Sequence, residues 1–466
     1  MAAPSQDVSC APAERAVFPP GLHNAYLFST FNAFSYQIVL NSPMVLYAKS
    51  LGASATVLGI IAGMMPLLVI FQIPAASHIP RLGYRRFVFA GWGTRVMFIF
   101  AMALVPLTVV FLKEETRLAL LLLLLFGFNL SRGISSCAWL PWITALVPPG
   151  LRGKYLARDA GVQNSASFLT FLLAAACLSE AVPGAPGPRA WQFAVLFGFS
   201  AAMGAVSLSF LKRIPDVEIP AEARPSKAPV PWLEMTRYRP FRKLLRELVG
   251  YSTAYGGLMA FTVAYLKAET GMTEGRILLV TSAAFLGGLC SLWFLGSRLD
   301  RLGSKPVLGF CFAGWLAVLG GWITLSGGAF PLRLPFILLL QFLMGLLAAM
   351  VQMANTRLAM AVIPVMGRNH FFAIYSVIGN VTLGLAPIGW GLLIDAVGAR
   401  SPHWLGLVWN HYTVFFAAVS CVFLVTLILA RRLEEPQAAS MEELLREILI
   451  QSPQRFWLRL WPRGGT

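Results

Sequence analysis

Long apolar stretches separated by short polar turns are the main pattern of this chain. Windows such as 16–48, 306–332 and 401–430 contain no Asp, Glu, Lys or Arg. About 20 apolar residues are enough to cross a bilayer as a helix, and a backbone in lipid must satisfy its own hydrogen bonds. The pattern therefore predicts an all-α polytopic membrane protein with twelve transmembrane helices. Their expected bounds are 22–47, 53–77, 87–112, 118–147, 155–180, 190–211, 244–268, 273–297, 306–328, 334–363, 370–396 and 405–430.

The two halves of the chain repeat each other. RLGYRR at 81–86 returns as RLGSKP at 301–306, and each follows the second apolar span of its half. VPPGLRGKY at 147–155 is mirrored by IPVMGRNHF at 363–371. We therefore expect two pseudo-symmetric six-helix bundles, and duplicated halves of membrane proteins usually enclose a binding site between them. A third match pairs Tyr47, Lys49 and Gly52 with Tyr265, Lys267 and Gly271.

This repeat divides the chain into five parts. The linker is rich in proline and basic residues, and the last part contains an amphipathic stretch at 441–460 that we interpret as a helix lying on the membrane surface. A solvated coil is the alternative for the last third of that stretch. The expected parts are a cytoplasmic tail (1–20), an N-terminal six-helix half (21–211), a cytoplasmic linker (212–240), a C-terminal six-helix half (241–430) and a cytoplasmic tail (431–466).

Composition and charge support this interpretation. The chain is 57% hydrophobic and 12% charged, against about a quarter charged in soluble domains, so a soluble globular fold is excluded. The net charge of +17 is unevenly distributed: 26 of the 37 Lys and Arg residues fall on one side of the expected spans and 8 on the other. This bias predicts cytoplasmic termini and explains the basic excess without nucleic acid. Because arginine far outnumbers lysine and no organelle signal is visible, we expect a bacterial inner membrane.

The loops that follow the second and eighth spans resemble the loop signature of the major facilitator superfamily. Its usual form is G-x-x-x-D-R-x-G-R-R, and Pro80 replaces the acid in the first copy. The resemblance covers nearly the whole chain and implies a monomeric transporter whose halves rock about a central site, with these loops latching helix ends on the cytoplasmic side. The expected loop residues are Arg81, Gly83, Arg85 and Arg86 in the first half and Gly296, Asp300, Arg301, Gly303 and Lys305 in the second.

Charged side chains inside membrane spans are costly and usually functional. Arg132 falls near the middle of the fourth span, which lines the cavity in this family, and we expect it to contact the substrate. The alternative is a structural arginine bonded to carbonyls near Pro141. Arg95 is a weaker candidate of the same kind. Asp159 and Arg357 are predicted at similar depth, so we hypothesise that they pair across the halves when the cytoplasmic side is closed.

No carboxylate is expected near the centre of spans 1, 4, 7 or 10, since Glu247 is placed at an inner helix end. Proton coupling is therefore not evident, and facilitated diffusion, exchange and proton uptake through Asp159 stay open. Neutral polar residues mark the expected cavity, although such residues also serve as hydrogen-bonding contacts between helices. Together with Arg132, the candidate substrate-binding residues are Asn32, Tyr36, Gln37, Asn129, Trp139, Gln163, Asn164, Tyr255, Gln352, Asn355 and Asn380.

The function expected from these features is active or facilitative transport of a small polar, possibly anionic, organic solute. The same fold acting as a lipid flippase, as a drug or metabolite exporter or as a transporter-like sensor is the alternative. A membrane transferase is a distant one, because the loops carry no paired acids. We expect no enzymatic activity, cofactor, metal or nucleic-acid partner. The partners are a small-molecule substrate and the bilayer, and the coupling ion is open.

Overall fold

The computed structural model describes residues 18–76, 78–148, 151–179, 190–217, 232–295, 303–363, 368–398, 400–404, 406–433 and 435. They are almost entirely helical, as predicted. The N-terminal half comprises α1 (His23–Leu40), α2 (Ser42–Ser50), α3 (Ala55–Leu68), η1 (Val69–Phe71), α4 (Gln72–Ala76), α5 (Ile79–Leu82), α6 (Tyr84–Leu104), η2 (Val105–Val110), α7 (Glu114–Ser135), η3 (Ser136–Ala138), α8 (Trp139–Leu146), α9 (Arg152–Cys177) and α10 (Ala190–Leu211).

The C-terminal half begins after the linker. It comprises α11 (Trp232–Arg237), α12 (Arg239–Tyr255), α13 (Leu258–Ala268), α14 (Glu274–Leu295), α16 (Ser304–Ser326), α17 (Leu334–Val362), α18 (Arg368–Val397) and α19 (His411–Arg431). A small antiparallel hairpin, β1 (His403–Trp404) and β2 (Leu407–Val408), precedes α19 and pairs His403 with Val408.

Ten helical segments of the described residues are long and apolar enough to cross a membrane. Predicted spans 1 and 7 are not among them, because each is broken into two helices. The first break is at Asn41, whose backbone is extended, and the Ser42-Pro43 pair then starts α2. The second break is at Gly256 and Gly257, where Gly257 takes the left-handed conformation (φ +78°). The prediction of continuous helices was wrong at these two places, and the count of twelve holds only if each broken pair is one span.

The duplicated loops confirm the internal repeat at the level of the backbone. Gly83 and Gly303 precede α6 and α16 with nearly the same angles, φ +79° and ψ 155° against φ +82° and ψ 165°. Gly52 and Gly271 also share positive φ values, of +79° and +63°. Positive φ favours glycine, which explains why these loops keep it in both copies. Gly296, Asp300 and Arg301 of the second loop, and the 441–460 stretch, lie outside the described residues.

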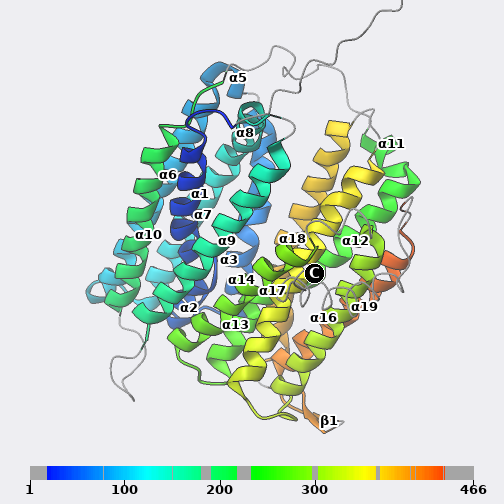
Figure 1. The fold of residues 1–466 in the computed structure, drawn as a ribbon. Coiled ribbons are helices and arrows are strands. Elements are labelled where there is room, and N and C mark those ends of the chain that lie inside the picture. Colours follow the sequence, from blue (N-terminus) through cyan, green and yellow to red (C-terminus); the bar gives the residue numbers. More distant parts are fainter. Residues whose placement is uncertain are drawn as a thin grey trace, which may run out of the picture.

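The two halves lie side by side and converge toward one end (Figure 1). We call this the closed end; it carries α2, α13 and the turns at 51–54 and 269–273. Here α3 packs on α18, α9 on α14 and α2 on α13. Toward the opposite end, which carries α5, α8 and α11, the helices of the two halves diverge, and we call it the splayed end.

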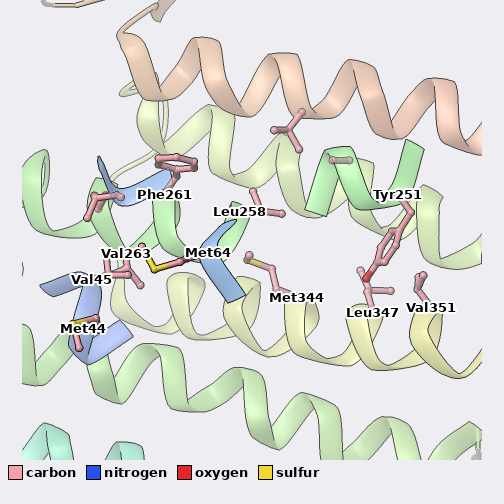
Figure 2. Close-up of a cluster of buried hydrophobic side chains, with 14 of the residues drawn as sticks. Met44, Val45, Met64, Tyr251, Leu258, Phe261, Val263, Met344, Leu347 and Val351 are labelled. Atoms are coloured by element: carbon pink, nitrogen blue, oxygen red, sulfur yellow. The ribbon is translucent and has the colours of Figure 1, made fainter. Parts of the chain in front are cut away.

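Close backbone approach and a shared apolar core hold the closed end together. A Cβ atom on Gly63 would overlap the carbonyl oxygen of Gly384, and one on Gly59 would overlap that of Pro387. One continuous buried cluster crosses the boundary between the halves. Figure 2 shows part of it, with Met44, Val45 and Met64 of the first half beside side chains of α13 and α17.

At the splayed end, an acid that follows the last helix of each half contacts the duplicated loop. The Glu435 carboxylate, 2% exposed, accepts hydrogen bonds from the backbone N–H groups of Ser304 (2.8 Å) and Lys305 (2.7 Å) at the start of α16, and it is bonded to the Arg357 guanidinium. In the first half, Asp216 lies 3.5 Å from Arg85. Glu435 therefore caps the start of α16 in the described residues.

Candidate functional site

A pocket of about 260 Å³ lies between the halves at the level of the two helix breaks. Asn41 and Ser42 line it from the first break, and Tyr255 and Gly257 line it from the second. Thr281 on α14 adds a hydroxyl. Broken membrane helices are tolerated where they border a cavity, and they often mark the substrate site of a transporter. The repeat therefore places equivalent breaks of both halves around one pocket.

A chain of polar side chains runs from this pocket along α1 and α9. Asn41 Nδ2 donates to Gln37 Oε1, and Gln37 Nε2 donates to Ser167 Oγ at 2.6 Å. The Ser167 hydroxyl then donates to the backbone oxygen of Gln163 at 2.7 Å. Because each of these groups is hydrogen-bonded to the next, they form a continuous polar track through an otherwise apolar half.

Toward the splayed end the track reaches an acid and a phenol. Gln163 Nε2 donates to Asp159 Oδ2 at 2.7 Å, and the Tyr36 hydroxyl donates to Gln163 Oε1 at 3.4 Å. Asp159 is 9% exposed, and its Oδ1 has no hydrogen-bond partner among the described residues. The track thus ends on a carboxylate with an open acceptor.

Two guanidinium groups, one buried (Arg95) and one half-buried (Arg132), lie near Tyr36. Arg132 of α7 lies over the Tyr36 ring, with 5.8 Å from its Cζ to the ring centroid. Arg95 of α6, 3% exposed, lies 4.6 Å from the Trp92 ring and 5.2 Å from the Phe128 ring. Within the described ranges neither forms an ion pair with Asp or Glu, and Arg95 Nε and Nη1 and Arg132 Nη1 have no hydrogen-bond acceptor. The aromatic rings provide the stabilisation that the described carboxylates do not.

Comparison with known proteins agrees with this architecture. The family model of the Major Facilitator Superfamily matches residues 248–462. The whole fold is similar to the D-xylose-proton symporter (TM-score 0.69, 12% identity, 89% of this chain and 98% of that one) and to the nucleoside transporter NupG (TM-score 0.62, 11% identity, 88% and 97%). The C-terminal half of the chain therefore matches the Major Facilitator Superfamily in sequence, and the whole chain shares its fold with these solved transporters.

One curated member is similar in sequence. "Probable anion transporter 4, chloroplastic" of Oryza sativa subsp. japonica is 28% identical over 158 residues, which are 32% of this chain and 26% of that protein. The chain therefore matches about a quarter of the length of this curated relative. The structure of the xylose transporter XylE from E. coli, in an inward open conformation, is another solved relative in fold (TM-score 0.66, 12% identity, 91% of this chain and 98% of that one).

Several predicted site residues have partners outside the track. Asn32 Oδ1 accepts a hydrogen bond from Trp92 Nε1 at 3.1 Å, and Asn129 Nδ2 donates to the backbone oxygen of Leu125 at 2.9 Å. Trp139 packs against the rings of Phe28 and Trp92. These three side chains contribute to the packing of the first half, which was the alternative given for polar residues of this kind.

The remaining candidates are spread over both halves. Asn164 donates to the backbone of Ala160 at 2.9 Å, and Gln352 is exposed. Asn380 donates to Ser376 at 2.8 Å and lines a second pocket, also of about 260 Å³, between α18 and the η1–α4 segment. Asn355 is buried against Glu247. Of the twelve candidates, Tyr36, Gln37, Gln163 and Arg132 belong to the track and its neighbouring guanidinium, and Tyr255 lines the pocket.

The hypothesised pair of Asp159 and Arg357 is not formed in this conformation. Arg357 contacts Glu435 and donates to the Ser304 hydroxyl at 3.2 Å, while Asp159 is bonded to Gln163. The hypothesis concerned a state closed at the cytoplasmic side, so it stays a prediction for that state. In the described part of the chain, no group of three or more His, Cys, Asp or Glu side chains could hold a metal ion.

The sequence analysis missed Asn41, Ser42 and Thr281 as pocket residues. Asn-Ser-Pro at 41–43 inside an apolar span is a turn signal that could have identified the first break. Glu247 was also misplaced. The structure puts it eight residues after the start of α12, 0% exposed, rather than at a helix end.

Proposed function

We propose that this chain transports a small, polar, negatively charged organic solute across a membrane by alternating access. One observation carries the proposal: Arg95, which is buried, and Arg132, which is half-buried, lie on neighbouring helices with buried N–H donors that have no hydrogen-bond acceptor and with no acidic partner among the described residues. An anionic solute would supply the missing acceptors. The guanidinium group presents a planar fork of donors that matches a carboxylate or phosphate.

The energetics favour an anion over a neutral solute. A buried, uncompensated charge is costly, and removing the partner of a buried ion pair costs about 3–5 kcal/mol. An anion bound at Arg132 removes this cost in the bound protein but not in the free protein. The difference contributes to the free energy of binding. Arg132 lies beside Tyr36 and contacts the solute, while Arg95, packed between Trp92 and Phe128, adds positive potential behind it.

Access to this site alternates between the two ends. In the structure the helices diverge at the splayed end, so the solute enters or leaves there (Figure 1). The polar track then connects the guanidinium pair with the pocket at the helix breaks. Rocking of the halves would open the closed end and expose the pocket to the other side.

The orientation follows from charge. The splayed end carries the basic loop of 81–86 and the start of the linker at Lys212 and Arg213. Under the positive-inside rule this end faces the cytoplasm, with both termini on that side of a bacterial inner membrane. The chain acts as a monomer and catalyses no covalent reaction. The curated anion transporter that matches part of the chain is in keeping with an anionic solute.

A thermal-shift screen tests the proposal. Purified protein is heated with carboxylates, phosphates, sugars, amines and lipophilic cations, and Arg132→Ala is run beside the wild type. A ligand at 100 times its Kd stabilises the folded state by about 2.7 kcal/mol, so a bound anion raises the Tm of the wild type. We expect no such shift in Arg132→Ala.

The exposed Arg333→Ala is the matched control and keeps the shift of the wild type. Equal stabilisation of the wild type and Arg132→Ala by the same anion would remove Arg132 from the site. Stabilisation by neutral or cationic ligands alone would overturn the anionic assignment.

A further inference from the structure

Glu247 is the one described carboxylate of the C-terminal half that is buried without a cation. It is 0% exposed on α12, about 12 Å from the start of that helix at 1.5 Å per residue. Glu274, also buried, is bonded to Lys267 at 2.6 Å, and Glu435 is bonded to Arg357. Among the described residues, no Lys, Arg or His forms an ion pair with Glu247.

The contact of Glu247 with Asn355 leaves one carboxylate oxygen without a hydrogen-bond donor among the described residues. Asn355 Nδ2 donates to Glu247 Oε1 at 3.4 Å. The other carboxylate oxygen, Oε2, and the other amide atom, Asn355 Oδ1, are both buried with no hydrogen-bond partner in the described part of the chain. Two acceptors are thus left open at one site. A proton on the carboxyl group converts one acceptor into a donor, and it removes the cost of a bare charge in an apolar interior.

The groups that face this site from the surrounding helices are neutral. Tyr375 of α18 interacts with Glu247, and Cys311 of α16 interacts with Tyr251 one turn along α12. α19 presents Thr426 to Gly250. The nearby cation of α17, Arg357, is engaged by Glu435.

A row of phenols links Glu247 to the pocket at the helix breaks. Tyr251 and Tyr255 follow at intervals of four residues, which places all three on one face of α12. The two rings are stacked with centroids 5.4 Å apart, and Tyr255 lines the pocket. Figure 2 shows Tyr251 extending from α12 toward Leu347 and Val351 of α17. A change at Glu247 is therefore transmitted through packed rings to the pocket wall.

We propose that Glu247 is a proton-binding site and that transport by this chain is coupled to protons through it. The carboxylate takes a proton from hydronium on one side of the membrane, carries it as a buried neutral carboxyl group, and releases it to water on the other side. Each cycle of protonation and release at Glu247 carries one proton across the membrane. The coupling rests on the proposed transport function, whereas the protonation of Glu247 does not.

Infrared spectroscopy tests the site without a substrate. Wild-type protein in lipid is titrated from acid to alkaline pH, and the loss of the C=O stretching band of protonated carboxyl groups is recorded. We expect a band that persists at neutral pH in the wild type and is missing in Glu247→Gln. Asp159→Asn and Glu269→Gln, the latter exposed and at the closed end of the same span, keep it.

Glu247→Asp provides a second measurement if the glutamine variant does not fold. The shorter side chain changes the hydrogen bond to Asn355, so the neutral-pH band shifts in frequency instead of vanishing. A wild-type spectrum without that band at neutral pH, or a band unchanged in both Glu247 variants, would overturn the proton site.

Coupling has its own test, with an anion found by the thermal-shift screen. In proteoliposomes containing a pH-sensitive dye, adding the anion to wild-type protein moves protons, and a pH gradient concentrates the anion. Glu247→Gln loses both but retains exchange of labelled for unlabelled anion. Proton-driven accumulation by Glu247→Gln would refute the coupling, whereas failure of every anion to bind would refute only the proposed function.

Discussion

Asp395 joins the two halves at the closed end, and its removal should shift the conformational equilibrium. The carboxylate lies near the end of α18 and accepts three hydrogen bonds from the start of α3 in the other half. The donors are Ala55 N (3.1 Å), Thr56 N (2.8 Å) and Thr56 Oγ1 (2.6 Å). Asp395 therefore caps the start of α3 from the other half, beside the helix's own N-cap residue Ser54.

The magnitude follows from known helix caps. Replacing an N-cap residue by alanine costs about 0.5–2 kcal/mol, and the Asp395 bonds are at the protein surface. We take about 1.4 kcal/mol, which changes an equilibrium constant tenfold. Because the bonds exist only when the closed end is shut, this free energy acts on the ratio of shut to open molecules. Asp395→Ala should raise the open population about tenfold.

Electron paramagnetic resonance can measure this ratio. Spin labels at Ser50 and Ala329, both exposed and one in each half, report the separation of the halves at the closed end. We expect more long distances in Asp395→Ala than in the wild type. Asp395→Asn keeps one acceptor oxygen and Thr56→Val removes one donor, so both should give a smaller increase than Asp395→Ala. An unchanged distribution in Asp395→Ala would show that the apolar and glycine contacts alone hold the end shut.

Three further predictions concern stability and the solute site. Glu435→Ala removes the carboxylate that is bonded to Arg357 and to the start of α16, so the free energy of unfolding should fall by about 1.5–3 kcal/mol, and an undiminished Tm would refute the capping role. Gly345→Ala places a Cβ against the Ala284 oxygen and should cost about 1–3 kcal/mol, whereas Gly320→Ala, with nothing within 4 Å, should be neutral or stabilising in the same melt. Arg132→Lys keeps the charge but loses the planar fork, so anion affinity should fall by about tenfold; affinity equal to that of the wild type would show that charge alone suffices.

Much of the fold could be predicted from local sequence, because membrane helices are specified by apolar length and by charge. The all-helical class, the two halves and the duplicated turns follow from this local information. The helix breaks were missed although both have local signals, because Asn41 and Gly256-Gly257 were outweighed by the apolar residues around them. The contact of Asp395 with Thr56 joins residues 339 positions apart, and no local pattern reports such a pairing.

Glu247 shows a different limit of sequence reasoning. It follows Arg246 directly, so a charge count places it at the end of the predicted span 244–268. In the structure α12 extends further, with Arg242, Arg246 and Val249 exposed and Leu244, Glu247, Leu248 and Tyr251 buried. Helical periodicity would have assigned Glu247 to the buried face. The candidate site residues themselves stay predictions, because binding depends on which polar groups face the solute.

The glycines between α3 and α18 have a kinetic consequence. Gly59, Gly63 and Gly391 bring backbone against backbone, and only the Leu67 side chain packs on Gly384 between them. When two surfaces with long side chains separate, rotamers must be released and later re-sorted, which adds an entropic barrier to each return. A seam of nearly bare backbone has few rotamers to re-sort, so its two faces come apart and meet again in a single register. This seam can thus open and shut many times with little delay, while its thermodynamic hold depends on contacts elsewhere.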